Sequence, residues 1–262
     1  MSNAAHNHLN LNNLPEIINK VPALTALFWF IKILATTLGE TAGDAVSMSL
    51  NLGYLLSTFI FAAIFFVAVT GQIKAKQFHP YLYWATIIAT TTVGTTLADY
   101  ATRSLGIGYT GGSALLLTLL LLSLAVWYKS MGSVAIHTIN TPKAELFYWL
   151  TIMFSQTLGT ALGDWTADTA GLGYLGAALI FGGILVALAI AYFVSNASKT
   201  FLFWSAFIVT RPLGAVVGDF LDKPLDHGGL ALSHFAASAA LLSIIFICIL
   251  IFPQRAAPTS SH

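Results

Sequence analysis

The segment Phe28–Asp44 reads FWFIKILATTLGETAGD, and three later segments repeat its pattern. They are YWATIIATTTVGTTLAD (Tyr83–Asp99), YWLTIMFSQTLGTALGD (Tyr148–Asp164) and FWSAFIVTRPLGAVVGD (Phe203–Asp219). All four fit the pattern aromatic-Trp-x9-Gly-x3-(Gly or Ala)-Asp without an insertion. Because the chain has only six Trp, chance does not explain this agreement, and the pattern indicates four internal repeats.

A second apolar stretch follows each acid after a short loop and opens with glycine. These stretches cover residues 53–71, 108–128, 173–194 and 229–252, and none contains a charged residue. The acids are 55, 65 and 55 residues apart, so the repeats pair as first with second and third with fourth. Each repeat therefore predicts two helices, one with the motif and one wholly apolar. The predicted repeats span about residues 22–74, 78–129, 143–195 and 199–252.

The composition places the chain in the membrane. Hydrophobic residues make up 57% of it and charged residues 8%, where soluble domains carry roughly 25% charged residues. Since a helical span needs about 20 apolar residues, eight spans use the whole chain. We expect an all-α integral membrane protein with eight transmembrane helices in one domain, 21–253, between tails 1–20 and 254–262. An even number of spans per repeat puts the pseudo-symmetry axis along the membrane normal.

The basic residues predict the orientation. Seven of the eleven lie in the tails or in loops before motif helices: Lys20, Lys74, Lys76, Lys129, Lys143, Lys199 and Arg255. Only Arg103 and Lys223 are expected in the loops on the opposite side. The positive-inside rule then places both termini in the cytoplasm. We expect Lys32 to reach the inner surface by snorkelling. The level of the acids is worked out on the assumption that the repeated Trp lies in the inner aromatic belt. A net charge of +1 gives no support to nucleic-acid binding, and the single Cys248 excludes an internal disulfide framework.

The repeated acid is the main candidate site. Asp44, Asp99, Asp164 and Asp219 lie 15 residues after the Trp, about 22 Å along a helix, and so still inside the bilayer. Each charge at the bilayer centre costs about 2.5–3.5 kcal/mol, so the acids should face the bundle interior and a cation or protons. Pairs of small residues before them predict close helix packing. These are Gly39 with Gly43, Gly94 with Ala98, Gly159 with Gly163, and Gly214 with Gly218.

Several residues differ between the repeats or add oxygen to the acids. Thr37, Thr92 and Thr157 precede the acids by seven residues and are predicted as auxiliary oxygen ligands. Glu40 occurs only in the first repeat, one turn before Asp44, which makes this repeat the strongest candidate to bind a cation. The predicted metal ligands are Asp44, Glu40 and Asp164. Arg211 and Asp168 are predicted to modulate the charge of the site; Arg211 either pairs with an acid or binds an anionic substrate group.

Other chemistries find no support in the sequence. Of seven His only His234 lies in a predicted span, and soft-metal clusters of Cys, Met or His are absent. The sequence has no Walker loop, zinc-protease motif or nucleophile elbow, so we expect neither an enzyme nor a bound cofactor.

The repeat also carries a family resemblance. The pattern Leu-Gly-x3-Gly-Asp, followed by Gly-Tyr about nine residues later, resembles a bacterial family of uncharacterised membrane-anchored proteins built from a repeat of unknown function. The resemblance covers about residues 25–252 and implies a multi-pass protein of the bacterial inner membrane. It implies no activity.

Three functional hypotheses follow from these residues. The first is a transporter or exporter of a small inorganic cation, manganese-like or magnesium-like and proton-coupled, through a central site lined by the repeated Asp. The second is a proton-coupled transporter of a small organic solute, recognised by Arg211, Trp165 and Tyr54, Tyr109 and Tyr174. The third is a non-transport sensor or assembly module, whose glycine faces would also suit a homo-oligomer. The partners expected are the lipid bilayer and a cation or proton.

Overall fold

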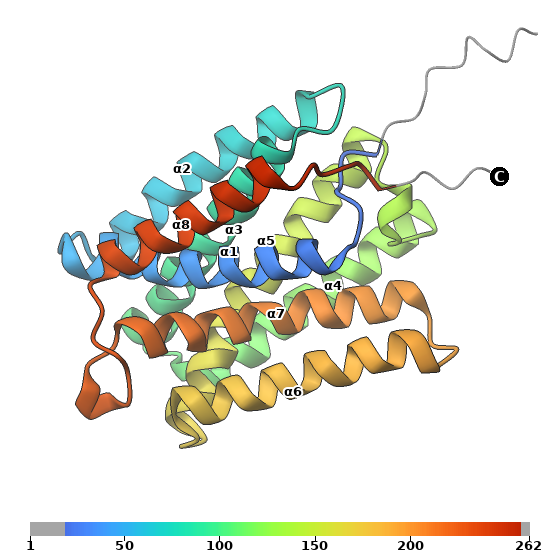
Figure 1. Ribbon diagram of the computed structural model, residues 1–262. Helices are drawn as coiled ribbons and strands as arrows, with labels where there is room; N and C mark the ends of the chain where they lie inside the picture. The colour runs from blue at the N-terminus through green and yellow to red at the C-terminus, as the bar shows by residue number, and fades with distance from the viewer. Residues whose placement is uncertain (1–18, 258–262) are drawn as a thin grey trace, which may run out of the picture.

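The computed structural model describes residues 19–257, and these residues form an all-helical bundle (Figure 1). The α-helices are α1 (Ala26–Asp44), α2 (Gly53–Lys74), α3 (Pro80–Asp99), α4 (Gly108–Met131), α5 (Pro142–Asp164), α6 (Gly173–Val194), α7 (Lys199–Asp222) and α8 (His234–Ile251). Eight helices in four repeats are thus present as predicted, with α8 beginning at His234 where residue 229 was expected. The predicted tails 1–20 and 254–262 lie mostly outside the described residues.

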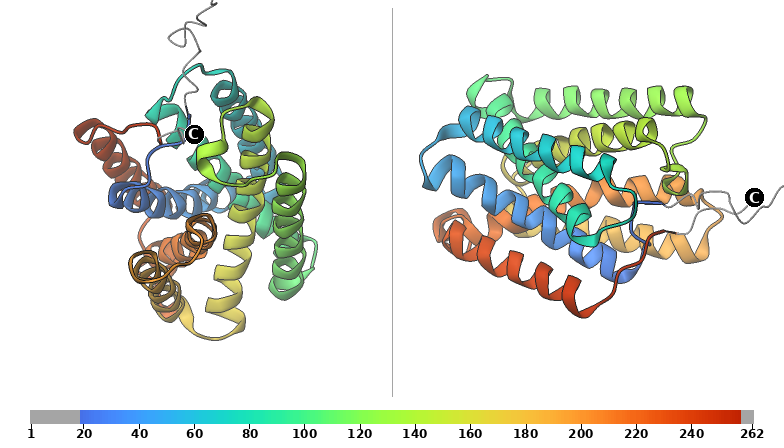
Figure 2. Two further views of the ribbon diagram at one scale, coloured as in Figure 1. Left: turned by 90° about the vertical axis from the view of Figure 1, so that its right-hand side faces the viewer. Right: turned by 90° about the horizontal axis from the view of Figure 1, so that it is seen from above.

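The four motif helices form a closed inner ring. Helix α1 packs against α3 and α7, and α5 packs against the same two helices, so α1 and α5 lie opposite each other. The apolar helices cover the ring from outside: α2 packs on α3, α4 on α5, α6 on α7 and α8 on α1. Each apolar helix therefore packs chiefly on the motif helix of the following repeat, not on that of its own. Figure 2 shows that the helices cross at marked angles.

The first glycine of each small pair explains how the ring closes. A Cβ atom at Gly39 would lie 2.3 Å from Thr91, and one at Gly94 would lie 3.0 Å from Gln156. The same relation joins Gly159 to Arg211 at 2.1 Å and Gly214 to Thr36 at 2.1 Å. Thr91, Gln156, Arg211 and Thr36 each lie eight residues before the acid of the next helix in the ring. The same close contact between adjacent motif helices thus occurs four times around the ring, once for the first glycine of each pair.

The first three motif helices do not end at their acids. They continue as π-helical segments η2 (Ala45–Ser49), η3 (Tyr100–Ser104) and η5 (Trp165–Thr169). Each then turns through two positions with positive φ, the second being Gly53, Gly108 or Gly173 at φ of 64–70°. A side chain is disfavoured in this conformation, which explains the glycine that opens each apolar helix. The fourth repeat has a different loop, with a short 3-10 helix at Leu225–His227.

The two shells of helices differ in their surface. Helices α2, α4, α6, α7 and α8 are long and apolar enough to cross a membrane. In an apolar 18-residue stretch of α2 and of α6 only 11% of the residues are buried, against 67% in the corresponding stretch of α7. The outer helices therefore expose apolar side chains such as Phe66, Val67 and Phe193 around the bundle, whereas polar residues lie inside it. This arrangement is the one expected of a multi-pass membrane protein.

Both ends of the described chain lie together at one end of the bundle (Figure 1), which we call the aromatic end. The backbone NH of Ala23 donates to the carbonyl of Arg255 (2.9 Å), and Lys20 pairs with Glu145 (2.5 Å). Three of the four repeated Trp do not lie on the outer surface, as an aromatic belt requires: Trp84, Trp149 and Trp204 are buried. They face the bundle core because the indole rings pack against one another and against buried Tyr.

Candidate functional site

The bundle interior is a stack of layers, each made of one residue from every motif helix. The acid layer consists of Asp44, Asp99, Asp164 and Asp219. Steps of four residues toward the aromatic end give the Glu40 layer (Glu40, Thr95, Thr160, Ala215), the Arg211 layer (Thr36, Thr91, Gln156, Arg211), the Lys32 layer (Lys32, Ile87, Ile152, Phe207) and the Tyr83 layer (Phe28, Tyr83, Tyr148, Phe203). Every residue in these layers is buried. Polar and charged groups thus follow the ring axis from the acid layer to the Lys32 layer.

A buried ion pair crosses the ring. Both terminal nitrogens of Arg211 donate to the Glu40 carboxylate at 3.0 Å, and one of them also donates to the hydroxyls of Thr95 and Thr160. These residues come from all four motif helices. Ala215, the fourth member of the Glu40 layer, is small. The Arg211 side chain, which starts one layer nearer the aromatic end, therefore has room to extend toward the acid layer. Of the two sequence hypotheses for Arg211, the structure places it in a pair with an acid.

Two basic residues hold the acid layer together in pairs. Arg103 contacts Asp99 (3.1 Å) and Asp164 (3.2 Å). Lys223 contacts Asp44 (2.5 Å) and Asp219 (3.1 Å). We call these sets the Arg103 triad and the Lys223 triad. Each base lies four residues after one acid in the sequence and reaches a second acid from a neighbouring helix, so each triad joins two repeats.

The charges in the triads favour the ionised forms of both bases. Burial alone would lower the pKa of the Arg103 guanidinium, but Asp99 and Asp164 outweigh it and raise that pKa above its ordinary value. Burial likewise opposes charge on Lys223, and Asp219 and Asp44 raise the pKa of its ammonium group. Both bases therefore remain cations at physiological pH.

More acid than base is gathered at this end. Beyond the Lys223 triad lies the buried Asp222, whose carboxylate is 3.9 Å from Lys223 and 3.7 Å from His234. Glu40, Asp44 and Asp219 each offer an oxygen, and these oxygens lie within 4.8 Å of one another. Asp44, Asp222 and His234 form a second group of the same kind. Both groups lie where α1 meets α7 and α8, and their oxygen-rich chemistry suits a hard cation.

The repeats place the chain in a known family. A family model described as Repeat of Unknown Function (DUF347) matches residues 27–78, 82–133, 147–198 and 202–255. The chain belongs to the DUF347 repeat family. The four matches confirm the fourfold repeat and the resemblance found in the sequence. Comparisons with curated proteins and with solved structures found no match.

Ring order changes the predicted metal ligands of this DUF347 chain. Asp164 lies on α5, opposite α1, so it joins neither oxygen group among residues 19–257 and pairs with Arg103 instead. Asp219, on the adjacent α7, takes the place predicted for Asp164 beside Glu40 and Asp44. Asp168, predicted to modulate the site, is exposed in η5.

The predicted threonine ligands face their own helices. The hydroxyls of Thr37, Thr92 and Thr157 donate to the backbone carbonyls of Ile33, Ile88 and Met153. The structure therefore does not bring them to the acids. The hydroxyls that enter the axis come instead from Thr95 and Thr160, which contact Glu40. They lie three residues after Thr92 and Thr157, and therefore four residues before the acids, at the spacing of the layers.

Lys32 corrects a further sequence expectation. Its side chain is fully buried, with Nζ 3.9 Å from the centre of the Phe207 ring, and so does not snorkel to a surface. The reason is that Lys32 lies one layer below Arg211 on the inner face of α1, where the ring encloses it. The bases of the triads, Arg103 and Lys223, are the residues that sequence reasoning assigned to loops. Their positions four residues after Asp99 and Asp219 were the available signal.

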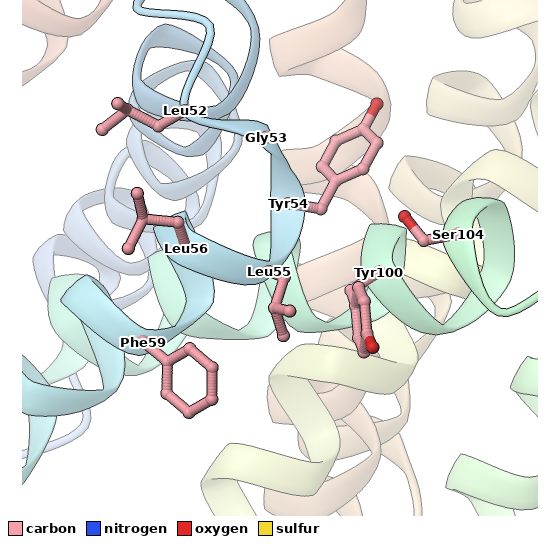
Figure 3. A pocket seen from close by; sticks show the side chains of 8 residues that line it. All are labelled: Leu52, Gly53, Tyr54, Leu55, Leu56, Phe59, Tyr100 and Ser104. Carbon is pink, nitrogen blue, oxygen red and sulfur yellow. The ribbon is translucent and has the colours of Figure 1, made fainter.

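A groove of about 460 Å³ lies outside the ring, between the start of α2 and segment η3. Its lining is mostly apolar, with Leu56 and Phe59 on one side and Tyr100 and Ser104 on the other (Figure 3). Tyr54 also lines it and lies 3.3 Å from Arg103 through its hydroxyl. The groove is part of the apolar outer surface and contains none of the repeated acids.

The Arg103 triad gives a stability prediction. Replacing Arg103 with Gln should lower the free energy of unfolding by about 1–3 kcal/mol, less than the 3–5 kcal/mol typical of a fully buried pair, because Arg103 is partly exposed. The loss should be larger at pH 8 than at pH 5, since protonation relieves repulsion between Asp99 and Asp164. Thermal unfolding in detergent at both pH values measures this. Lys129→Gln, at an exposed lysine, is the control, and equal losses at both pH values would contradict the prediction.

Proposed function

We propose that this DUF347 protein is a membrane transporter of a small inorganic cation, with manganese-like or magnesium-like divalent ions as the first class to test. In this proposal all eight helices span the bacterial inner membrane, with the ring axis along the membrane normal. The aromatic end, where the loops that lead into α3, α5 and α7 lie, faces the cytoplasm, because most of the lysines are near these loops in the sequence. Protons couple to the movement of the ion.

One observation carries the proposal, namely the excess of buried acid. Six buried carboxylates lie at the acidic end, from Glu40, Asp44, Asp99, Asp164, Asp219 and Asp222. Three fixed cations, Arg103, Arg211 and Lys223, contact them within the described chain. A buried carboxylate without a counter-charge is costly, so the remaining charge calls for protons or bound cations.

Lys223 indicates where the ion would bind. Its ammonium group lies within 4 Å of Asp44, Asp219 and Asp222, a position that a divalent cation would share. We infer that an arriving ion displaces Lys223 and takes oxygens from Glu40, Asp44 and Asp219. Because Lys223 follows α7 rather than lying within it, its side chain can withdraw without unfolding the helix.

The axis is closed on both sides of the Arg211 layer, which favours a gated carrier over an open channel. The Arg211–Glu40 pair crosses it below the acid layer, and the Tyr83 layer crosses it near the aromatic end, where the hydroxyls of Tyr83 and Tyr148 are 2.7 Å apart. An ion moving along the axis would have to separate both contacts. This order of closures suits a site that opens to one side at a time.

The alternative of an organic solute has less support. Arg211 is engaged with Glu40, and Tyr54 and Tyr109 lie against Arg103, at 5.9 and 5.8 Å from its guanidinium carbon to their ring centres. Three of the five residues assigned to recognise a solute are thus occupied within the chain. A protein that served only as an assembly module would not need buried charged side chains along the ring axis.

Ion flux into proteoliposomes tests the proposal. With purified protein, manganese uptake should fall to the rate of empty liposomes in Asp44→Asn and Asp219→Asn, because each removes a charge from the oxygen group. Asp226→Asn, at an exposed acid of the loop after α7, should transport at the wild-type rate. Size-exclusion profiles would show that the variants fold. Unchanged flux in Asp44→Asn would refute the proposed site.

A further inference from the structure

Polar atoms without partners gather on the aromatic side of the Arg211–Glu40 pair. Within residues 19–257, Lys32 Nζ has no hydrogen-bond partner, although its side chain is fully buried. The same holds for both amide atoms of Gln156, for Thr91 Oγ1 and for Arg211 Nε. Buried polar groups are nearly always hydrogen-bonded, so five such atoms in two adjacent layers call for an explanation.

These atoms come from the four motif helices and belong to two adjacent layers of the ring. Lys32 on α1 and Gln156 on α5 lie on opposite sides of the ring, as do Thr91 on α3 and Arg211 on α7. Lys32 packs on the ring of Phe207, which lies one turn before Arg211 on α7. The two basic side chains are therefore about one helical turn apart along the axis.

The chemistry of this region is that of a donor-rich, positive site. Lysine, the guanidinium Nε, the amide nitrogen and the hydroxyl all donate hydrogen bonds. Within the described chain, Glu40 is the carboxylate that Arg211 contacts, and it accepts from the terminal nitrogens of Arg211 and not from its Nε. In the described chain Lys32 forms no ion pair, and the cation–π contact with Phe207 supplies no hydrogen-bond acceptor.

We propose that the Lys32 and Arg211 layers bind a small inorganic anion, with chloride as the ion to test first. Lys32 Nζ, Gln156 Nε2, Thr91 Oγ1 and Arg211 Nε donate to it, and its charge balances Lys32. Ile87, Ile152 and Phe207 complete the Lys32 layer with apolar surface. A site that takes its donors from two adjacent layers, about one helical turn apart, suits a small ion such as a halide or nitrate and not a large organic anion.

This anion site is distinct from the proposed cation site. The Arg211–Glu40 pair separates them, because the terminal nitrogens of Arg211 are engaged with Glu40 whereas its Nε is left without a partner. Anion binding would place opposite charges on the two sides of that pair and lower the cost of burying Lys32 and Arg211 inside the membrane.

Anion-dependent thermal unfolding of the purified full chain tests the site. At constant ionic strength, chloride should raise the unfolding midpoint relative to gluconate, and the rise should saturate with concentration. Lys32→Met should abolish this rise, and Gln156→Leu should weaken the apparent chloride affinity by about tenfold, as expected when a hydrogen bond to a charged ligand is lost. Lys129→Met, at an exposed lysine, should keep the full response.

A second variant keeps the test decisive if Lys32→Met does not fold. Gln156→Glu places a carboxylate where the anion would bind, so its midpoint in gluconate should equal or exceed that of the wild type, and chloride should have no further effect. An identical wild-type midpoint in chloride and gluconate, or a full chloride response in folded Lys32→Met or Gln156→Glu, would overturn the proposal. Neither result depends on cation flux, so the cation site stands or falls separately.

Discussion

Replacing Arg211 with Met should lower the free energy of unfolding by about 3–5 kcal/mol, because it leaves the Glu40 carboxylate buried without a cation. The Arg211 side chain has no exposed area and that of Glu40 is 3% exposed, so water cannot compensate for the loss. The hydroxyls of Thr95 and Thr160 also lose their donor. Thermal unfolding in detergent, followed by tryptophan fluorescence, measures the effect.

A double variant separates the ion pair from simple packing. Combining Arg211→Met with Glu40→Gln removes both charges and should recover a large part of the loss, since a neutral buried pair costs less than one isolated charge. Arg255→Met, at an exposed arginine, should unfold at the wild-type temperature. Additive losses in the double variant would mean that Glu40 and Arg211 do not act as a pair.

A single methyl group at the ring contacts should have an effect of similar size. In Gly214→Ala the added Cβ would lie 2.1 Å from Thr36 Oγ1 and 2.8 Å from the Thr36 backbone carbon, so α1 and α7 must move apart. Such overpacking typically costs about 1–3 kcal/mol and sometimes more. Because Thr36 adjoins Lys32 and Glu40 on α1, we expect a loss at the upper end of this range.

The matched control for Gly214→Ala lies on the outer shell. A Cβ atom added at Gly182 on α6 would meet no other atom within 4 Å. Gly182→Ala should therefore leave the midpoint unchanged or raise it, since alanine favours helix by about 1 kcal/mol over glycine. Comparing the folded yield and the midpoint of the two variants checks the prediction. Equal losses at both positions would show that the close approach of α1 and α7 contributes little.

The repeat explains why so much of the fold could be predicted. Four copies of one pattern indicated the number of helices, their order and the burial of the acids. A pattern that arose by chance would have had to recur in all four repeats. The basic residues that pair with the acids were harder to predict from the sequence. We expected Arg103 and Lys223 in loops, since the motif alone suggests that its helices end at the acids. The π-helical continuation of α3 carries Arg103 back to Asp99.

Contacts between repeats could not be derived from spacing. Nothing in the local sequence says that Arg211 reaches Glu40, because this requires α7 to lie beside α1 and Ala215 to leave room. The same reason explains why Asp219 and not Asp164 joins Glu40 and Asp44. The buried Trp were missed because an amphipathic ring fits a membrane interface and a bundle core equally well.

The packing of α8 on α1 makes the bundle cyclic. It repeats the contact of α2 on α3, so the junction between the last repeat and the first is equivalent to the three junctions that the polypeptide joins covalently. The ends of the described chain already form an antiparallel bridge, between Pro22 and Ala256. The packing of apolar helix on motif helix is thus the same for all four circular permutations of the repeat order.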